Sequence, residues 1–542
     1  MQQTKEEKRF RRSPSRRKST RICADLPVEV YVHDKERQAA WCSISGMLLD
    51  VSPSGVAVEV REPISQSADV RVRLNPSNSA ESIEFDAKVA WSRPSNSGGE
   101  VHCGLSFGTL MPKQTEVLTE YINSLLRSES RKPKLERREL GYYETYVHSL
   151  ESLDLFHQPR EIDSSAAPIV KIGGKEMVSL CSNNVMGSAV NPEVIEASCA
   201  ATRQYGTSCG SSRLVGGNLS IQVKLEHRIA TFMRRDAGIV YMTGYMANLG
   251  LILSMSSAVN LETSYETSER VAIFCDRQNH TSIIQGCKLS ENVNGARVRY
   301  YLHRDMNDLE RLLQKSSAAR KIIVSEGVFS MIGDIAPLKD IVTLARKYHA
   351  LTIVDDAHAI GILGESGRGS TEALKEDGID IILGTFSKAF GAVGGFVVTR
   401  QELIEYFKLQ SPTYIFSSAL PPGVAGGILK AIDILDTTPA IRERLWKNVN
   451  YFKERVVQAG FTLLDSQSHI TPIFIGEDAI SKRVSQKLFH RGTFIQEVRW
   501  PAVASKRSIL RCMPSAIHTT QQLDKVIDDL IAVGKEEKLI PS

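Results

Sequence analysis

The sequence has no apolar run that approaches the roughly 18 residues a membrane-spanning helix needs. Its basic N-terminus also lacks the apolar segment of a secretory signal peptide. Its nine cysteines form an odd total and include no CxxC pair, which argues against a disulfide framework and against a zinc site. No internal repeat is visible. These absences predict a cytoplasmic protein with no integral membrane segment and no bound metal.

The composition is that of an ordinary globular protein, with 542 residues of which 42% are hydrophobic. Lys and Arg number 67 against 62 Asp and Glu, but the excess is local, because residues 1–21 hold nine basic side chains and two acidic ones. Such a basic tip is either a disordered arm or an anion-binding segment. We expect a disordered arm over residues 1–14 and no nucleic-acid partner.

The first part of the chain is rich in short alternating segments. They lie at 28–32, 44–51, 55–60, 69–74, 85–91 and 101–107. Their alternation and β-branched content predict a small barrel or sandwich. A helical pattern at 115–127 and a charged, proline-bearing stretch follow, so the predicted domain spans 15–127 and a linker spans 128–140.

From about residue 140 the pattern changes to strongly apolar strands that alternate with amphipathic helices. The strands are expected at 238–243, 270–276, 321–327, 351–357, 379–386 and 394–399. Strands this apolar are buried on both faces, which predicts an α/β domain with a parallel sheet covered by helices, over 141–424. Residues 425–542 mix helices with short strands and predict a smaller α+β lobe.

The segment GTFSKAFGAVGG (384–395) presents one lysine at the end of a predicted strand. Thr385 and Ser387 offer hydroxyl groups to an anion, and the glycines allow the backbone to approach a ligand closely. A Schiff-base lysine for a phosphorylated aldehyde cofactor needs this setting, which makes Lys388 the candidate. The alternative is an exposed loop lysine.

Three upstream segments carry chemistry of the same kind. VDDAHAIG places Asp355 at the end of a buried strand, where a carboxylate keeps a pyridine nitrogen protonated, although an Asp there also serves as a helix N-cap. MTGYMANLG is a strand-to-helix junction whose N–H groups at Gly244 and Tyr245 suit a phosphate. DRQNHTS adds His280, whose ring is able to stack on a cofactor.

These motifs occur in one order, and residues 140–535 resemble the α-oxoamine synthases, pyridoxal-phosphate enzymes of fold type I. The resemblance rests on CSNNVMG (181–187), YGTSCGSSRLVGG (205–217), TGYMANLG (243–250), DRQNHTS (276–282), EGVFSMIGDIAPL (326–338), DDAHAIGILGESGRG (355–369), GTFSKAFGAVGG (384–395), YIFSSALPP (414–422) and RCMPSAIHT (511–519). It implies a cofactor, pyridoxal 5'-phosphate, and two substrates, an amino acid and an acyl-CoA or acyl-carrier-protein thioester.

The resemblance also implies residue roles. The catalytic group is Lys388, Asp355, His280 and His358, where Lys388 moves protons, Asp355 faces the pyridine nitrogen, His280 stacks on the ring and His358 lies near the phenolic oxygen. The remaining cofactor contacts are Gly244, Tyr245, Glu326, Ser330, Thr385 and Ser418, and the substrate contacts are Asn183 and Arg511. Ser418 reaches the phosphate of the neighbouring subunit in the family, which implies a homodimer.

Some positions depart from the family pattern, namely Val185, Met186, Gln222, Ile332 and Ile509, together with the longer stretch 255–270. They put the amino-acid and acyl specificity in doubt but not the core chemistry. Two alternatives stay open: a fold-type I aminotransferase or lyase, and a binding protein whose enzyme domain is a relic. Intact Lys388, Asp355 and His280 weigh against the second.

The N-terminal region resembles a PilZ domain, a bacterial receptor for cyclic di-GMP. Two short motifs carry the resemblance, RKSTR (17–21) and DVSPSG (50–55). Arginines bind phosphates and stack on guanine, while Asp and Ser side chains hydrogen-bond a base edge. The implied cyclic di-GMP contacts are Arg16, Arg17, Arg21, Asp50, Ser52 and Gly55. Because some PilZ domains are only structural, that alternative also stays open.

Overall fold

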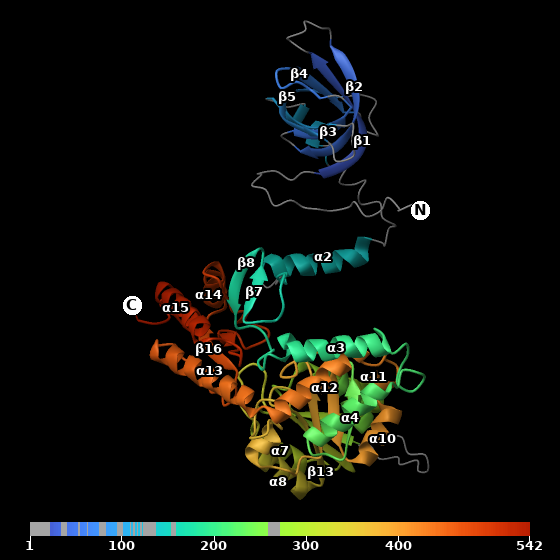
Figure 1. The fold of residues 1–542 in the computed structure, drawn as a ribbon, viewed down its shortest axis with the longest axis vertical. Helices are drawn as coiled ribbons and strands as arrows, with labels where there is room; N and C mark the ends of the chain where they lie inside the picture. The colour runs from blue at the N-terminus through green and yellow to red at the C-terminus, as the bar shows by residue number, and fades with distance from the viewer. Residues whose placement is uncertain are drawn as a thin grey trace. The chain divides into compact units, whose positions relative to one another are not determined.

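The computed structural model describes residues 22–33, 41–52, 55–61, 63–74, 83–94, 101–108, 110–111, 114–115, 117–119, 122, 137–152, 159–257 and 271–541. The chain divides into two compact units, residues 1–158 and 159–542 (Figure 1). No helix in these ranges is long and apolar enough to cross a membrane.

The first unit contains a closed six-stranded barrel in the order β1-β2-β3-β6-β5-β4, which confirms the predicted small barrel. The strands are β1 (Ile22–His33), β2 (Cys42–Ser52), β3 (Gly55–Val60), β4 (Asp69–Leu74), β5 (Ile83–Pro94) and β6 (Val101–Phe107). Alternate residues point inward, and Val30, Leu48, Val58, Val72 and Phe85 are fully buried in its core. Each predicted strand segment lies within one of these strands.

Two helical segments follow the barrel. Residues 114–115, 117–119 and 122 are helical, and the rest of the helix expected at 115–127 lies outside the described residues. Helix α2 (Arg137–Ser152) includes the last four residues of the predicted linker, 137–140.

The second unit is built on a seven-stranded sheet in the order β11-β10-β12-β13-β14-β15-β9. Its strands are β9 (Ala237–Tyr241), β10 (Val271–Asp276), β11 (Arg297–Tyr301), β12 (Arg320–Glu326), β13 (Ala350–Asp355), β14 (Ile381–Thr385) and β15 (Gly395–Thr399). The predicted parallel sheet is mixed at one strand, because β15 runs antiparallel to both β14 and β9. The connection at 386–394 is too short for the helical crossover that a parallel pair requires.

Helices cover both faces of this sheet (Figure 1). They are α3 (Pro192–Tyr205), α4 (Ser220–Phe232), α5 (Gly244–Ser256), α6 (Thr281–Asn294), α7 (Met306–Gln314), α8 (Leu338–Tyr348), α9 (Ser370–Leu374), α10 (Gln401–Gln410), α11 (Pro412–Ile415) and α12 (Pro422–Thr437), preceded by the 3₁₀ turn η1 (Ser188–Val190). Helices α3 and α12 pack side by side (Figure 1). A Cβ at Gly426 of α12 would lie 2.5 Å from Cβ of Ala201, so the glycine permits this close packing.

A smaller lobe contains two three-stranded sheets. Strands β16 (Thr471–Gly476), β19 (Ser508–Cys512) and β18 (Glu497–Val498) form one, and β17 (Thr493–Phe494), β8 (Lys175–Ser179) and β7 (Ile169–Ile172) form the other. Helices α13 (Pro439–Gln458), α14 (Asp478–His490) and α15 (Thr520–Glu536) complete the lobe, and Phe452, Leu488, Leu510 and Leu523 are fully buried in its core. The pairing of β8 with β17 brings residues 169–179, far upstream in sequence, into this lobe.

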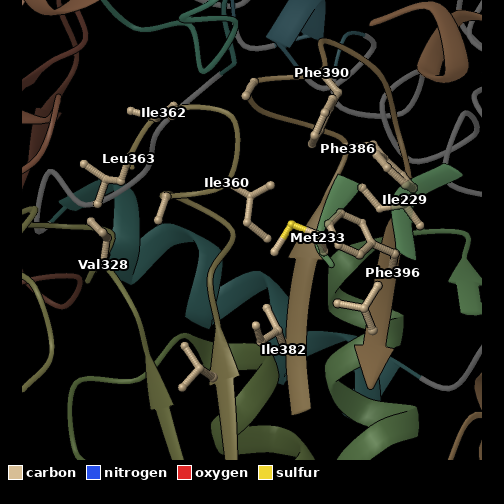
Figure 2. Close-up of a cluster of buried hydrophobic side chains, with 14 of the residues drawn as sticks. Ile229, Met233, Val328, Ile360, Ile362, Leu363, Ile382, Phe386, Phe390 and Phe396 are labelled. Atoms are coloured by element: carbon tan, nitrogen blue, oxygen red, sulfur yellow. The ribbon is translucent and has the colours of Figure 1, made fainter. Parts of the chain in front are cut away.

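Aromatic side chains pack under the loop that carries Lys388. Figure 2 shows Phe386 and Phe390 of the loop, with Phe396 of β15, lying against Ile229 and Met233 from the end of α4. The ring centroid of Phe386 lies 5.5 Å from that of Phe390 and 4.8 Å from that of Phe396. The side chains of Phe386 and Phe390 therefore anchor the loop in the hydrophobic core.

Candidate active site

A cavity of about 560 Å³ opens at the carboxyl ends of the parallel strands, where α/β sheets place their ligand sites. It is lined by eleven of the predicted residues: Asn183, Gly244, Tyr245, His280, Glu326, Ser330, Asp355, His358, Thr385, Lys388 and Arg511. Ser418 does not line it and is exposed. The chain thus brings segments 328 residues apart, from Asn183 to Arg511, into one site.

Lys388 lies in a loop held by main-chain hydrogen bonds. The N–H of Gly391 donates to its carbonyl at 3.0 Å, and the N–H of Ala392 donates to the carbonyl of Phe386 at 2.9 Å. Ser188 Oγ also donates to the carbonyl of Ala389 at 2.7 Å. Burial lowers the pKa of the Lys388 ammonium, and the charge of Asp355 opposes this shift. A larger fraction of this lysine is therefore the neutral amine than in water.

Asp355 and His280 are joined by two polar side chains that the sequence reasoning missed. Asn248 Nδ2 on α5 donates to Asp355 Oδ2 at 2.7 Å and to Ser282 Oγ at 2.9 Å. Ser282 Oγ lies 2.7 Å from Nδ1 of His280, and its N–H also donates to that nitrogen at 3.3 Å. Because Nδ1 accepts these bonds and burial lowers the pKa of His280, its imidazole is neutral.

The first turn of α5 forms the end of the cavity suited to an anion. Thr243 caps the helix, accepting a hydrogen bond from the N–H of Met246 at 3.1 Å. The N–H groups of Gly244 and Tyr245 lie in the first turn, where main-chain N–H groups lack helical partners. A Cβ at Gly244 would lie 3.1 Å from Cβ of Thr385, so glycine allows β14 to approach this turn.

Arg511 of β19 also lines the cavity. Its Nε donates to the carbonyl of Ser330 at 2.7 Å, which orients the guanidinium. Burial lowers the pKa of Arg511 to about 10, so it remains a cation at neutral pH. The buried Oδ1 of Asn183, which also lines the cavity, has no hydrogen-bond partner within the described residues.

His358 lies near a second buried histidine, His469, which the sequence reasoning also missed. The ring centroids of His358 and His469 are 6.2 Å apart. Burial, together with the charges of Lys388 and Arg511, lowers the pKa of His358 well below its ordinary value and that of His469 to about 3. Both rings are therefore neutral at physiological pH.

Three of the residues predicted to contact cyclic di-GMP, Asp50, Ser52 and Gly55, lie in strands of the barrel. Ser52 is fully buried, and its Oγ donates to the carbonyl of Gly55 at 3.1 Å. A Cβ at Gly55 would lie 2.2 Å from the carbonyl oxygen of Leu105, which requires glycine. The backbone of Asp50 pairs with Ala57, but its side chain is not described. The predicted contacts Arg16, Arg17 and Arg21 lie outside the described residues.

Two family models match the chain, one in each of its two compact units. The family "aminotransferase class I and II" matches residues 175–530, and the PilZ domain family matches residues 15–124. The 8-amino-7-oxononanoate synthase of Thermoanaerobacter pseudethanolicus is 38% identical over 405 residues, which are 74% of this chain and 99% of that protein. The 8-amino-7-oxononanoate synthase 1 of Bacillus subtilis is 36% identical over 405 residues, 74% of this chain and all of that protein.

Solved structures with the same fold include further enzymes. Serine palmitoyltransferase from S. paucimobilis, with PLP and myriocin bound, is 31% identical with a TM-score of 0.68 and covers 74% of this chain and 99% of its own. Sphingomonas wittichii serine palmitoyltransferase is 30% identical with a TM-score of 0.68 and the same two coverages. The 8-amino-7-oxononanoate synthase of Francisella tularensis is 26% identical with a TM-score of 0.55, over 67% of this chain and 99% of its own.

Proposed function

The chain belongs to the aminotransferase class I and II family, and we propose that it is an α-oxoamine synthase that condenses a small amino acid with an acyl thioester. It is a pyridoxal-phosphate-dependent enzyme of the acyltransferase type, with a PilZ domain in front. The observation that carries the proposal is that Lys388, Asp355 and Arg511 line one cavity. In the proposed reaction the amino acid loses its carboxylate as CO₂, and CoA or a carrier protein is the leaving thiol.

The residues of the cavity fit pyridoxal phosphate. Asp355 is a buried carboxylate whose two oxygens accept hydrogen bonds from Asn248 and from the N–H of Ala357, which suits the pyridine nitrogen. The first turn of α5, beside Thr385, suits the phosphate, and Lys388 suits the aldehyde. When bound, pyridoxal phosphate supplies an electron sink for negative charge at the α-carbon of the amino acid.

The chain's own side chains supply binding and proton transfer. Arg511 holds the amino-acid carboxylate, because a guanidinium binds carboxylates in a bidentate geometry. Lys388 Nζ takes the proton from the α-carbon and returns one, a role favoured by its lowered pKa. His280 and His358 are neutral, so neither adds a positive charge that would lower the proton affinity of Lys388 further.

Lys388→Ala tests the cofactor assignment. This variant should lose the visible absorbance of the holoenzyme and the covalent mass that borohydride reduction otherwise leaves on the protein. Lys453→Ala is the matched control, because burial also lowers the pKa of Lys453, to about 8, but Lys453 does not line the cavity. A Lys388→Ala protein that still traps the cofactor covalently would contradict the assignment.

The competing function is a fold-type I aminotransferase or lyase with a structural PilZ-like domain. A panel of small amino acids with and without an acyl-CoA separates the two. The synthase consumes the amino acid only when the thioester is present and releases an α-aminoketone and free thiol. An aminotransferase consumes it with a keto acid instead.

We also propose that the active enzyme is a homodimer in which Ser418 serves the partner's phosphate site. Beside the exposed Ser418 lies Phe416, which is 86% exposed, and the N–H of Ala419 donates to the carbonyl of Ser211 at 3.3 Å. The loop that contains Ser211 also carries Val215, which is 84% exposed. Two such apolar side chains on joined loops support burial against a second copy.

Mixing two inactive variants tests this arrangement. If Ser418 acts on the partner's site, a hybrid of Lys388→Ala and Ser418→Ala protomers has one complete site and regains activity. If Ser418 acts within its own protomer, no site in the hybrid is complete and activity stays low. Sedimentation of the wild-type enzyme provides the oligomeric state.

For the barrel we propose cyclic di-GMP binding through Arg16, Arg17, Arg21, Asp50 and Ser52. The buried Ser52, which donates to the carbonyl of Gly55, and the obligatory Gly55 support a fixed position for these two residues of the ligand motif. Calorimetry on the full chain should give binding that is lost in Arg17→Ala/Arg21→Ala. The control is Arg71→Ala/Arg73→Ala, a barrel pair whose side chains form ion pairs with Glu84. No heat with the wild-type chain would contradict binding, and binding without a change in turnover would leave localisation as its role.

A further inference from the structure

Glu326 is a buried carboxyl group that faces the cavity with one oxygen lacking a partner. The residue ends β12 and is 3% exposed. Its main-chain N–H donates to Oδ1 of Asn279 at 2.9 Å, which fixes the backbone. Its Oε1 has no hydrogen-bond partner among the described residues. Because an unpartnered buried oxygen costs free energy, the geometry calls for a group of a bound molecule there.

A second carboxyl group lies beside Glu326. Glu326 and Asp355 are direct partners in the pairing of β12 with β13, and both are buried at the end of their strand. Two neighbouring carboxyl groups in one buried site do not ionise together. Asp355 accepts N–H donors on both oxygens, at 2.7 and 3.1 Å, and such donors stabilise the anion. The charge therefore resides on Asp355 and the proton on Glu326.

The electrostatic setting agrees with this division. Burial and the charge of Asp355 raise the pKa of Glu326 well above its ordinary value. The charge of Lys388 and the main-chain N–H groups of His280 and Ser330 oppose the rise without cancelling it. The other titratable groups that line the cavity include Arg511, a cation, and the neutral imidazoles of His280 and His358. Cys181 and Tyr245 line it too, and burial raises the pKa of the Cys181 thiol to about 12, so that the thiol is neutral.

A neutral Glu326 suits the ligands of the proposed function better than an ionised one. Both pyridoxal phosphate and an amino acid bring anionic oxygens into the cavity. An ionised Glu326 would repel them, whereas a carboxylic acid donates a hydrogen bond. Proteins use buried carboxylic acids in this way to stabilise negative charge on oxygen.

We propose that Glu326 is a neutral carboxylic acid that donates its O–H in a hydrogen bond to an anionic oxygen of the molecule bound in the cavity, and keeps its proton throughout. The inference rests on the proposed function only for the identity of that molecule. Two acceptors share the required chemistry: the phenolate oxygen of pyridoxal phosphate and the carboxylate oxygen of the amino acid. No bond to the proton breaks in this role, so Glu326 needs no proton acceptor.

Infrared difference spectra of the holoenzyme test the protonation state. We expect a carbonyl band of a protonated carboxyl group that disappears in Glu326→Gln. Asp356 is the control, because burial raises its pKa to about 7 and it bonds Ser370 rather than lining the cavity. Measured well above that pKa, the band should persist in Asp356→Asn. If Glu326→Gln leaves the spectrum unchanged, the proposal is overturned.

The same band identifies the acceptor. A shift on adding pyridoxal phosphate to the cofactor-free protein assigns the phenolate oxygen, and a shift only on adding L-alanine to the holoenzyme assigns the carboxylate. A band that moves in neither step overturns the donor role.

Binding constants give an independent readout. Because an amide also donates, Glu326→Gln should keep the Kd of the assigned ligand within about threefold, while Glu326→Ala should raise it by roughly 10- to 100-fold. Tighter binding in Glu326→Gln would show that Glu326 is ionised and overturn the proposal. None of these measurements needs acyl transfer, so the two proposals are tested separately. If the Glu326 band is present but no α-aminoketone is formed, the proposed function is wrong and the proposal for Glu326 stands.

Discussion

Asn248 on α5 donates a hydrogen bond of 2.7 Å to Oδ2 of Asp355 at the end of β13, across 107 positions of sequence. The same amide nitrogen holds Ser282, and through it the ring of His280. One buried side chain therefore orients two groups that are predicted to contact the cofactor.

We predict that Asn248→Ala weakens cofactor binding. A hydrogen bond to a charged group contributes about 1.5–3 kcal/mol, so the Kd for pyridoxal phosphate should rise by roughly 10- to 100-fold. Absorbance titration of the cofactor-free protein measures it. Asn294→Ala is the control, because among the described residues that amide bonds Leu253 and Ser256, neither of which lines the cavity. Equal effects of the two substitutions would contradict the role given to Asn248.

Alanine substitutions at two glycines distinguish the effect of backbone strain from the effect of a displaced Lys388 loop. Gly391 and Gly295 both have φ of 65°, but a Cβ at Gly391 would lie 2.2 Å from the main-chain nitrogen of Ala189, while the space at Gly295 is open. Gly295→Ala should cost about 1–2 kcal/mol of unfolding free energy and leave cofactor binding unchanged. Gly391→Ala should cost more and also displace Lys388, lowering cofactor affinity. Chemical denaturation and cofactor titration measure the two quantities.

His303 should make stability depend on pH. Burial lowers its pKa, but hydrogen bonds to Asp276 at 3.0 Å and Asp334 at 2.8 Å outweigh this and raise the pKa to about 9. Because the folded pKa exceeds the ordinary 6.5, the stabilisation is fully present below about pH 6.5 and is lost as the pH rises through 9. Its size is on the order of 3 kcal/mol.

Unfolding free energies measured between pH 6 and 10 check this dependence. His303→Gln should flatten the profile across that window and lower stability at its acidic end. A wild-type stability that rises from pH 6 to 9 while the variant follows the same curve would contradict the assignment.

Arg213 and Glu226 form a buried bidentate ion pair, with N···O distances of 2.9 and 2.7 Å and side chains 5% and 9% exposed. Removing one partner leaves an unpaired buried charge, so Arg213→Met should destabilise the second unit by about 3–5 kcal/mol. The double substitution Arg213→Met/Glu226→Met should cost less than the sum of the single ones. Additive losses in thermal or chemical unfolding would argue against coupling.

The sequence predicted most of the cavity because its motifs sit at strand ends, and the topology of a parallel sheet collects strand ends on one edge. It did not reveal Asn248, Ser282 or His469, whose functions depend on contacts between distant segments. One signal was available: Asn248 is a polar residue in the largely apolar α5, where an amide is kept only if it is hydrogen-bonded.

The predicted segments match all six barrel strands and six of the seven strands of the large sheet, but they miss β11 and did not give the orientation of β15. The apolar pattern of β15 is the same for either direction, and only the length of loop 386–394 distinguishes them. Strands β7 and β8 escaped prediction because each is short, and β8 also pairs with β17, more than 300 residues later. Such pairings are set by tertiary packing and not by local propensity.

The aromatic anchoring of the Lys388 loop has a consequence for isotope exchange. The amide hydrogens of Phe386, Gly391 and Ala392 are all bonded within the loop, and its rings are locked into the core against α4 (Figure 2). Loops ordinarily exchange their amide hydrogens for deuterium quickly, through local opening. Here the amide hydrogens of the Lys388 loop should exchange as slowly as those of β14. The reactive amine would then lie in one of the segments of the enzyme that open least often.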